Sequence, residues 1–296
     1  MSLYSVNSSH DTITSMNGAT KIKETRCRNT VFRWGLKTYV MGIVNVSPDS
    51  FSGDGIVTVD RALSQAREFY ADGADIIDIG GESTRPGSQP ISDAEEIHRV
   101  IPAVRRISQE LPIPVSVDTY KYEVARAALD AGAHMINDIR ALRDIRLAGL
   151  AAERKVPIVL MSNQRNQQER HIMPAILADL RRAIDMAVKN GVSRENIIID
   201  PGIGFGKTLE QNCEIVRRLD ELKKLKQPVL LGTSRKSMIG LVLDLPADQR
   251  LEGTAATVAI GIAGGADIVR VHDVRAMIRV SKMSDAIVRR SWGRSQ

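Results

Sequence analysis

The sequence feature that most constrains the fold is a recurring unit that joins a helix end to a buried strand. Residues 71–78, 130–137 and 264–270 read ADGADIID, DAGAHMIN and GGADIVR. In each copy a glycine, a common signal for the end of a helix, precedes a short apolar run. Such runs are typical of parallel strands that are buried on both faces. Each run leads to a polar residue: Asp78, Asn137 or Arg270. The repeat therefore predicts helices that alternate with parallel strands.

The whole chain contains eight candidate strands with helical patterns between them. They lie at 40–46, 76–79, 115–117, 135–137, 158–161, 197–200, 229–232 and 268–271. Eight strand–helix pairs over about 250 residues predict an α/β fold, the (β/α)8 TIM barrel, as a single domain over residues 31–296. Residues 1–30 are rich in Ser, Asn and Thr and are expected to form a flexible N-terminal tail. Residues 31–36 and 39–46 are expected to pair as a short hairpin.

An open, doubly wound sheet would show the same alternation, but it gathers functional groups at one switch point. A barrel brings the ends of all its strands to one mouth. Polar groups stand at or just past nearly every strand end here: Asn45, Glu82, Asp118, Asn137, Ser162, Asp200, Ser234 to Lys236, Arg270 and His272. This distribution favours the barrel.

A glycine-rich turn follows the strand at 197–200, in the stretch IIIDPGIGFGKT. It resembles a phosphate-binding loop, yet the first glycine of that motif would fall at Pro201, which has no N–H to offer. The dinucleotide pattern G-x-G-x-x-G fails as well, because Lys207 stands where the last glycine is needed. The stretch therefore predicts a carboxylate, Asp200, held at a strand end by a stiff turn.

Composition narrows the function classes. No apolar run approaches the about 20 residues that span a membrane, so no membrane partner is expected. The net charge is +6, but the basic residues are scattered, and no nucleic-acid partner is expected. The two cysteines show no metal or redox spacing, which indicates the cytoplasm. Small anionic ligands would account for the charge.

The strand-end residues fall into two chemical groups. Asp118, Asn137 and Asp200 suit the ring N–H and amino groups of a flat heterocycle. The second group consists of cationic or nearly cationic residues, which suit a phosphate or carboxylate: Lys236, Arg85, Arg270 and His272. Each residue also has a structural explanation when it is taken alone. Asp118 could cap a helix, and Asn137 could stand in a turn. His272 could be hydrogen-bonded at a loop base, and Phe205 could simply fill space. Their convergence on one cavity favours a ligand site.

Seven ordered segments resemble the dihydropteroate synthase family over about residues 39–285. They are MGIVNVSPDSFS (41–52), IGGESTRPG (79–87), SVDT (116–119), IND (136–138), DPGIGF (200–205), GTSRKS (232–237) and RVHD (270–273). The resemblance implies a (β/α)8 barrel that is usually a homodimer and uses Mg²⁺. The implied reaction joins 6-hydroxymethyl-7,8-dihydropterin pyrophosphate to p-aminobenzoate, giving 7,8-dihydropteroate and pyrophosphate in folate biosynthesis. Sulfonamides would mimic p-aminobenzoate.

The resemblance also implies roles for individual residues. Asp118, Asn137, Asp200, Phe205 and Lys236 would bind the pterin. Asn45, Arg270 and His272 would bind pyrophosphate, with Asn45 also at the metal. Thr84, Arg85 and Ser237 would lie near p-aminobenzoate. Lys236, Arg270 and Asp118 would be catalytic.

Two departures from the family pattern affect the expected mouth. Ser162 replaces a histidine that is common at the end of the fifth strand, and Asp54 is shifted by one place in the first loop. The loops 47–55 and 83–88 are candidates to close over the ligand. Two alternatives stay open: a pterin-binding methyltransferase domain, or an inactive paralogue that binds pterin.

Overall fold

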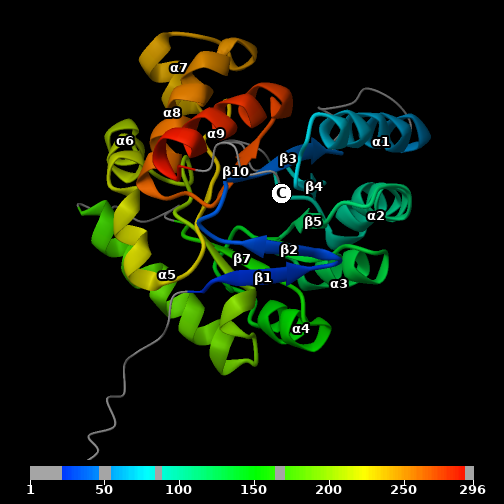
Figure 1. The fold of residues 1–296 in the computed structure, drawn as a ribbon. Helices are drawn as coiled ribbons and strands as arrows, with labels where there is room; N and C mark the ends of the chain where they lie inside the picture. The colour runs from blue at the N-terminus through cyan, green and yellow to red at the C-terminus, as the bar shows by residue number, and fades with distance from the viewer. Residues whose placement is uncertain (1–21, 47–54, 84–88, 164–170, 291–296) are drawn as a thin grey trace, which may run out of the picture.

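A computed structural model describes residues 22–46, 55–83, 89–163 and 171–290. Within these residues eight parallel strands form one sheet in the order β8-β7-β6-β5-β4-β3-β10-β9. The two ends of this order meet through a parallel bridge between Ile199 and Val229, and the Ile199 N–H donates to the Pro228 carbonyl at 3.0 Å. The sheet is therefore closed, which confirms the barrel and excludes the open sheet (Figure 1).

The barrel strands are β3 (Tyr39–Asn45), β4 (Ile76–Gly80), β5 (Val115–Asp118), β6 (Met135–Asp138), β7 (Ile158–Met161), β8 (Ile197–Asp200), β9 (Leu230–Leu231) and β10 (Ile268–Val271). The helices around them are α1 (Gly55–Ala71), α2 (Asp93–Glu110), α3 (Tyr122–Asp130), α4 (Arg146–Arg154), α5 (Ile172–Lys189), α6 (Leu209–Arg217), α7 (Ser237–Leu243), α8 (Leu251–Gly264) and α9 (Val274–Val288). Short 3₁₀ turns lie at Arg194–Asn196, Leu219–Leu225 and Ala247–Gln249. No helix among the described residues combines the length and the apolar character needed to cross a membrane.

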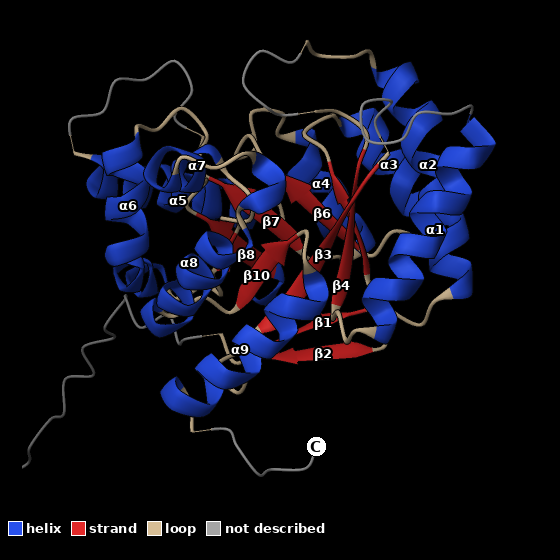
Figure 2. Ribbon diagram, turned by 90° about the horizontal axis from the view of Figure 1, so that it is seen from above, coloured by secondary structure: helices blue, strands red, loops and turns tan. Residues whose placement is uncertain are grey.

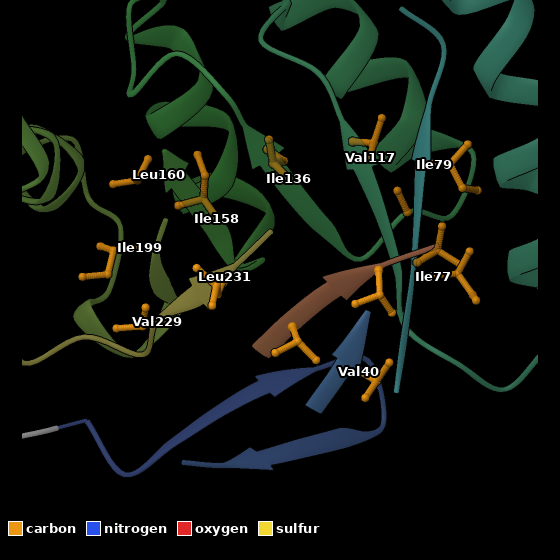
Figure 3. Close-up of a cluster of buried hydrophobic side chains, with 14 of the residues drawn as sticks. Val40, Ile77, Ile79, Val117, Ile136, Ile158, Leu160, Ile199, Val229 and Leu231 are labelled. Atoms are coloured by element: carbon orange, nitrogen blue, oxygen red, sulfur yellow. The ribbon is translucent and has the colours of Figure 1, made fainter. Parts of the chain in front are cut away.

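Successive residues of each strand alternate between two apolar layers. Residues that face outward, such as Val40, Ile77 and Ile136, pack against the helices in the main core (Figure 3). Inward residues, such as Met41, Ile76 and Met135, fill the barrel itself. Because side chains alternate with a period of two, the two layers account for the continuous apolar runs in the sequence.

The hairpin expected at residues 31–46 is wrong. The observed hairpin pairs β1 (Glu24–Cys27) with β2 (Thr30–Arg33), and residues 39–45 form the first barrel strand. The reason is that β3 pairs in parallel with β4 on one side and β10 on the other. In a hairpin with residues 31–36 it could not have both of these partners. The hairpin includes residues that were assigned to the tail, while residues 1–21 lie outside the described part of the chain.

The hairpin closes the N-terminal end of the barrel (Figure 2). Phe32, Trp34 and Cys27 pack onto the inward apolar layer. The Phe32 ring stacks on the Trp34 ring, with the ring centres 5.6 Å apart. It also packs edge-to-face with the Tyr39 ring, with the centres 4.9 Å apart. The opposite end, where the strands terminate, is left for the polar residues.

Candidate active site at the barrel mouth

Inward-facing polar side chains gather at the carboxyl ends of the strands. The register pairs Asp118 with both Gly80 and Asn137, Asn45 with Gly80, and Asp78 with Ile43. Asp200 ends β8 and Arg270 is the last residue but one of β10. Parallel strands bring these ends to one mouth, so the structure unites Asn45, Asp118, Asn137, Asp200 and Arg270, as the sequence predicted.

Arg270 lies at the centre of this group. Its Nε donates to Asp78 Oδ2 and its Nη2 donates to Asp118 Oδ2, both at 2.6 Å. Burial lowers the pKa of the guanidinium, but the charges of Asp78 and Asp118 outweigh it and hold the pKa above its ordinary value. Arg270 is therefore a permanent cation whose fork is oriented by two carboxylates.

Asp78 is a site residue that the sequence reading did not select. Its side chain is fully buried and also accepts a hydrogen bond from Asn137 Nδ2 at 3.1 Å. The signal was available, because Asp78 holds the same place in the recurring unit as Asn137 and Arg270. Glu82, just past the end of the same strand, was expected to be its polar residue instead.

Two carboxylate oxygens in the group could each accept a hydrogen bond from a ligand. Asp78 Oδ1 and Asp118 Oδ1 are buried, and neither has a hydrogen-bond partner among the described residues. Burial raises the pKa of Asp118 to about 7, with Arg270 opposing the shift and Asp78 adding to it. Buried acceptors without partners are costly, so this mouth is suited to a ligand that brings N–H donors.

Asp200 occupies the end of β8 and starts the glycine-rich loop. Its Oδ1 accepts a hydrogen bond from the Gly202 N–H at 2.7 Å. Burial raises the pKa of this carboxyl, although the charge of Lys236 opposes the shift. Gly202 has a φ of +71°, and a β-carbon there would lie 2.0 Å from the Ser162 carbonyl oxygen. Only glycine fits this turn.

An apolar patch lies beside the polar group. It consists of Ile139, Met161 and Phe205, with the partly buried Tyr120 packed against it. Lys236 Nζ lies 4.8 Å from the centre of the Phe205 ring and donates to the Ile203 carbonyl. Phe205 was expected at the site. Ile139 and Met161 were not selected, because an apolar residue at a strand end has no distinctive signal in the sequence.

Hydrogen bonds and an ion pair connect the loop after β9 to the loop after β10. His272 N–H donates to Ser234 Oγ at 3.1 Å, and His272 Nδ1 lies 3.0 Å from the same oxygen. Arg235, which has a φ of +58°, forms a two-pronged ion pair with Asp273. Ser237 stands exposed at the start of α7. These contacts place Lys236 and His272 on neighbouring loops at the mouth.

Some expected residues are elsewhere. Ser162 does not face the mouth, because its Oγ donates to Asp179 Oδ2 of helix α5 at 2.9 Å. Thr84, Arg85, Asp54 and most of the two candidate closing loops lie outside the described residues. Among the described residues no group of three or more His, Cys, Asp or Glu side chains could hold a metal ion.

Comparisons with known proteins identify relatives of this chain. The family described as pterin binding enzyme matches residues 41–272. Dihydropteroate synthase of Bacillus subtilis is 53% identical over 254 residues, covering 85% of this chain and 89% of its own. Solved dihydropteroate synthases include one from Clostridium difficile determined in the presence of pteroic acid, with 48% identity, a TM-score of 0.84 and coverage of 86% and 98%. Another, from Xanthomonas albilineans with 4-aminobenzoic acid, has 38% identity, a TM-score of 0.85 and coverage of 90% and 98%. The chain belongs to the dihydropteroate synthase family of pterin-binding enzymes, which are transferases of folate synthesis.

Proposed function

We propose that the barrel mouth joins 6-hydroxymethyl-7,8-dihydropterin pyrophosphate to p-aminobenzoate, releasing pyrophosphate and 7,8-dihydropteroate. The observation that carries this proposal is the arrangement around Arg270. One cation is held between Asp78 and Asp118, beside further hydrogen-bonding groups on Asn137 and Asp200. Such a site can receive both a donor-rich ring and an anionic leaving group.

The pterin ring would lie on Phe205, Ile139 and Met161, with its polar edge toward the carboxylates. The ring carries adjacent N–H and amino donors, and a carboxylate offers two acceptor oxygens side by side. Asp200 is the proposed partner of these two donors. Asp118 and Asn137 would receive the remaining polar edge, and Lys236 would contact the ring from the opposite loop.

The pyrophosphate would lie against Arg270 and His272, with Asn45 contributing an amide oxygen. Asn45 ends β3 beside Gly80, across from Asp118. Mg²⁺ prefers oxygen ligands and is commonly held by one or two protein groups together with substrate phosphates, so a single amide oxygen fits this role. When bound, the ion would neutralise charge on the phosphate oxygens.

In the reaction, the bond from the pterin methylene carbon to the pyrophosphate oxygen breaks, and that oxygen keeps the electron pair. The p-aminobenzoate nitrogen forms a new bond to the carbon and loses a proton. Arg270 and Lys236 would stabilise the growing negative charge, as preformed cations do in a water-poor site. Ser237, with Thr84 and Arg85, would orient p-aminobenzoate through its carboxylate.

We also propose that the enzyme is a homodimer through α7, α8 and α9, which lie together (Figure 1). Residues 253–266, which include most of α8, contain no charged residue, although α8 packs only one face against the barrel. Ile260 on α8 and Met283 and Ile287 on α9 are 54%, 62% and 69% exposed. Exposed apolar surface of this kind is typical of a subunit interface. Sedimentation of Ile260→Glu as a monomer, against a dimeric wild type, would support this surface.

We place the enzyme in the cytoplasm. Cys27 and Cys213 are both free thiols. A reducing compartment keeps thiols in that state.

One assay tests the reaction against its alternatives. Release of pyrophosphate from the pterin pyrophosphate is measured with and without p-aminobenzoate. A synthase releases it in step with formation of dihydropteroate. A methyltransferase domain or an inactive paralogue would bind the pterin and release none, which would overturn the proposal.

A further inference from the structure

Lys207 is a partly buried lysine that the proposed reaction does not use. It stands in the Gly-Lys-Thr sequence that resembles the end of a phosphate-binding loop. Its Nζ donates to three carbonyl oxygens: Gly202 at 2.9 Å, Ser162 at 3.1 Å and Phe205 at 3.3 Å. An ammonium group has three donors, so the three carbonyls satisfy all of them.

A phosphate is therefore not the partner of this sequence. The donors of Lys207 are taken by the protein's own backbone. The neighbouring Thr208 caps helix α6, because its side chain accepts from the Gln211 N–H at 3.2 Å. Both residues that would contact a phosphate are occupied in holding the fold.

The charge on Lys207 is not balanced by a direct ion pair. No carboxylate lies within 4.0 Å of Nζ among the residues that the structure describes, although Asp200 and Asp179 act from further away. Burial lowers the pKa of Lys207 to about 7, with the nearby Lys236 also lowering it and the two carboxylates opposing. A methionine would fill similar space without this cost, but it would remove a donor from each of the three carbonyls. The Gly202 carbonyl would keep the Phe205 N–H at 3.2 Å.

Two of the three carbonyls that Lys207 contacts belong to the glycine-rich loop with the proposed pterin contacts, and the third, that of Ser162, follows β7. Gly202 and Phe205 lie two and five residues after Asp200. Lys236 takes the Ile203 carbonyl from the other side, and Asn212 Oδ1 accepts from the Gly204 N–H at 2.7 Å. Because Gly202, Gly204 and Gly206 all have positive φ, the backbone has little stiffness of its own there. The shape of the loop depends on these side chains.

We propose that Lys207 is a positioning residue for pterin recognition, which fixes the loop so that Asp200 and Phe205 keep the geometry that binds the ring. The inference rests on the proposed roles of Asp200 and Phe205. It predicts that loss of the Lys207 donors weakens pterin binding and leaves the p-aminobenzoate step almost unchanged.

The test compares Lys207→Met with Asp200→Asn and with Lys189→Met, a control that removes an exposed lysine at the end of α5. We measure the Kd of the dihydropterin pyrophosphate without p-aminobenzoate, and the KM of p-aminobenzoate at saturating pterin. Lys207→Met should raise the pterin Kd by about 10- to 100-fold, because small displacements of binding groups have effects of this size. The KM of p-aminobenzoate should change by less than about threefold, because the substitution weakens only pterin binding and this KM is measured at saturating pterin.

The outcomes separate this inference from the site on which it rests. If Asp200→Asn weakens pterin binding and Lys207→Met does not, the positioning role is overturned and the pterin site stands. If neither variant weakens it, the pterin site itself is wrong. An equal rise in the Kd for pterin and the KM for p-aminobenzoate would reduce Lys207 to general support of the fold. If Lys207→Met melts below the assay temperature, Lys207→Gln, which keeps two N–H donors, is judged by the same limits and should lie between Met and wild type.

Discussion

The two ends of the barrel differ although the same strands build both. Near the N-terminal end the inward residues are apolar, such as Ile76, Met135 and Ile268, and the hairpin covers them. Two residues further along the same strands, the inward residues are Asp78, Asn137 and Arg270. One step of the period-two alternation therefore separates a layer that stabilises the fold from the layer that forms the candidate active site.

The difference shows that burial alone does not decide the role of a barrel position. Asp78 is as buried as Ile76. It is tolerated because Arg270 and Asn137 donate to it, whereas the apolar end needs no such partners. Variants at the two ends should therefore separate stability from activity.

The largest effect is expected from Arg270→Met. It removes the cation shared by Asp78 and Asp118, and with it the proposed pyrophosphate contact. We expect kcat/KM to fall by about 10⁴-fold, ~5.4 kcal/mol of barrier, since a preformed buried charge is lost together with its partners' orientation. Steady-state kinetics checks this, and a loss below tenfold would contradict the central role of Arg270.

Phe32→Ala tests the opposite end. Phe32 is fully buried and stacks on Trp34, so its truncation leaves a cavity. We expect the free energy of unfolding to fall by about 3–5 kcal/mol. The kcat/KM of the folded protein should stay within about twofold of wild type, because transition-state contacts are untouched. Urea unfolding and kinetics on one preparation measure both quantities. A large loss of activity at unchanged stability would erase the distinction between the two ends.

Asp200→Asn tests whether Asp200 binds the pterin or only shapes the turn. Asn still offers an oxygen to the Gly202 N–H, as caps of either type do. Against a ring donor, however, its NH₂ leaves buried groups unpaired, at a cost of about 2–4 kcal/mol. We expect kcat/KM for the pterin substrate to fall about a hundredfold or more, with little change in Tm. Near wild-type kinetics would reduce Asp200 to a structural residue.

The pH dependence of stability should also distinguish the ends. The pKa of Asp118 is raised to about 7 by burial, from an ordinary value of 3.8. The folded state therefore holds this proton more tightly, and its contribution to stability is complete below pH 3.8 and lost as the pH rises through about 7. Asp118→Asn should remove a slope approaching ~1.4 kcal/mol per pH unit between these limits. Phe32→Ala should keep that slope. Urea unfolding at a series of pH values from 4 to 8 measures the free energy of unfolding against pH. Parallel curves of this free energy for Asp118→Asn and wild type would count against the raised pKa.

The smallest effect is expected from Ser162→Ala. Ser162 lies at the end of β7, yet its hydroxyl turns outward to Asp179. We expect activity to stay within about tenfold, ~1.4 kcal/mol of barrier. The backbone carbonyl that Lys207 holds is unchanged by this substitution. A loss well beyond tenfold in kcat would mean that the outward face of the strand end affects the chemistry.

Most of the mouth could be predicted from the sequence because polar residues interrupt apolar runs in a regular pattern. Asn137 and Asp200 end runs that are otherwise apolar, and Arg270 interrupts one. A parallel barrel leaves one place where such strand ends meet. Asp78 could have been found by the same pattern. Ile139 and Met161 could not, because an apolar residue looks the same in the sequence whether it faces a helix or a ligand.

The sequence by itself determined the alternation of helices and strands, the barrel and the kinds of side chain at its mouth, since these follow from local periodicity and residue chemistry. The tertiary structure alone decided the pairings between distant segments. Residues 39–45 pair with β4 and β10 instead of the neighbouring hairpin, because two parallel partners satisfy more backbone groups than one. Lys207, whose Gly-Lys-Thr sequence is like the end of a phosphate-binding loop, donates to backbone carbonyls because the fold brings the end of β7 beside the glycine loop. Contacts of this kind depend on where segments far apart in the chain meet, and local sequence patterns carry no record of that.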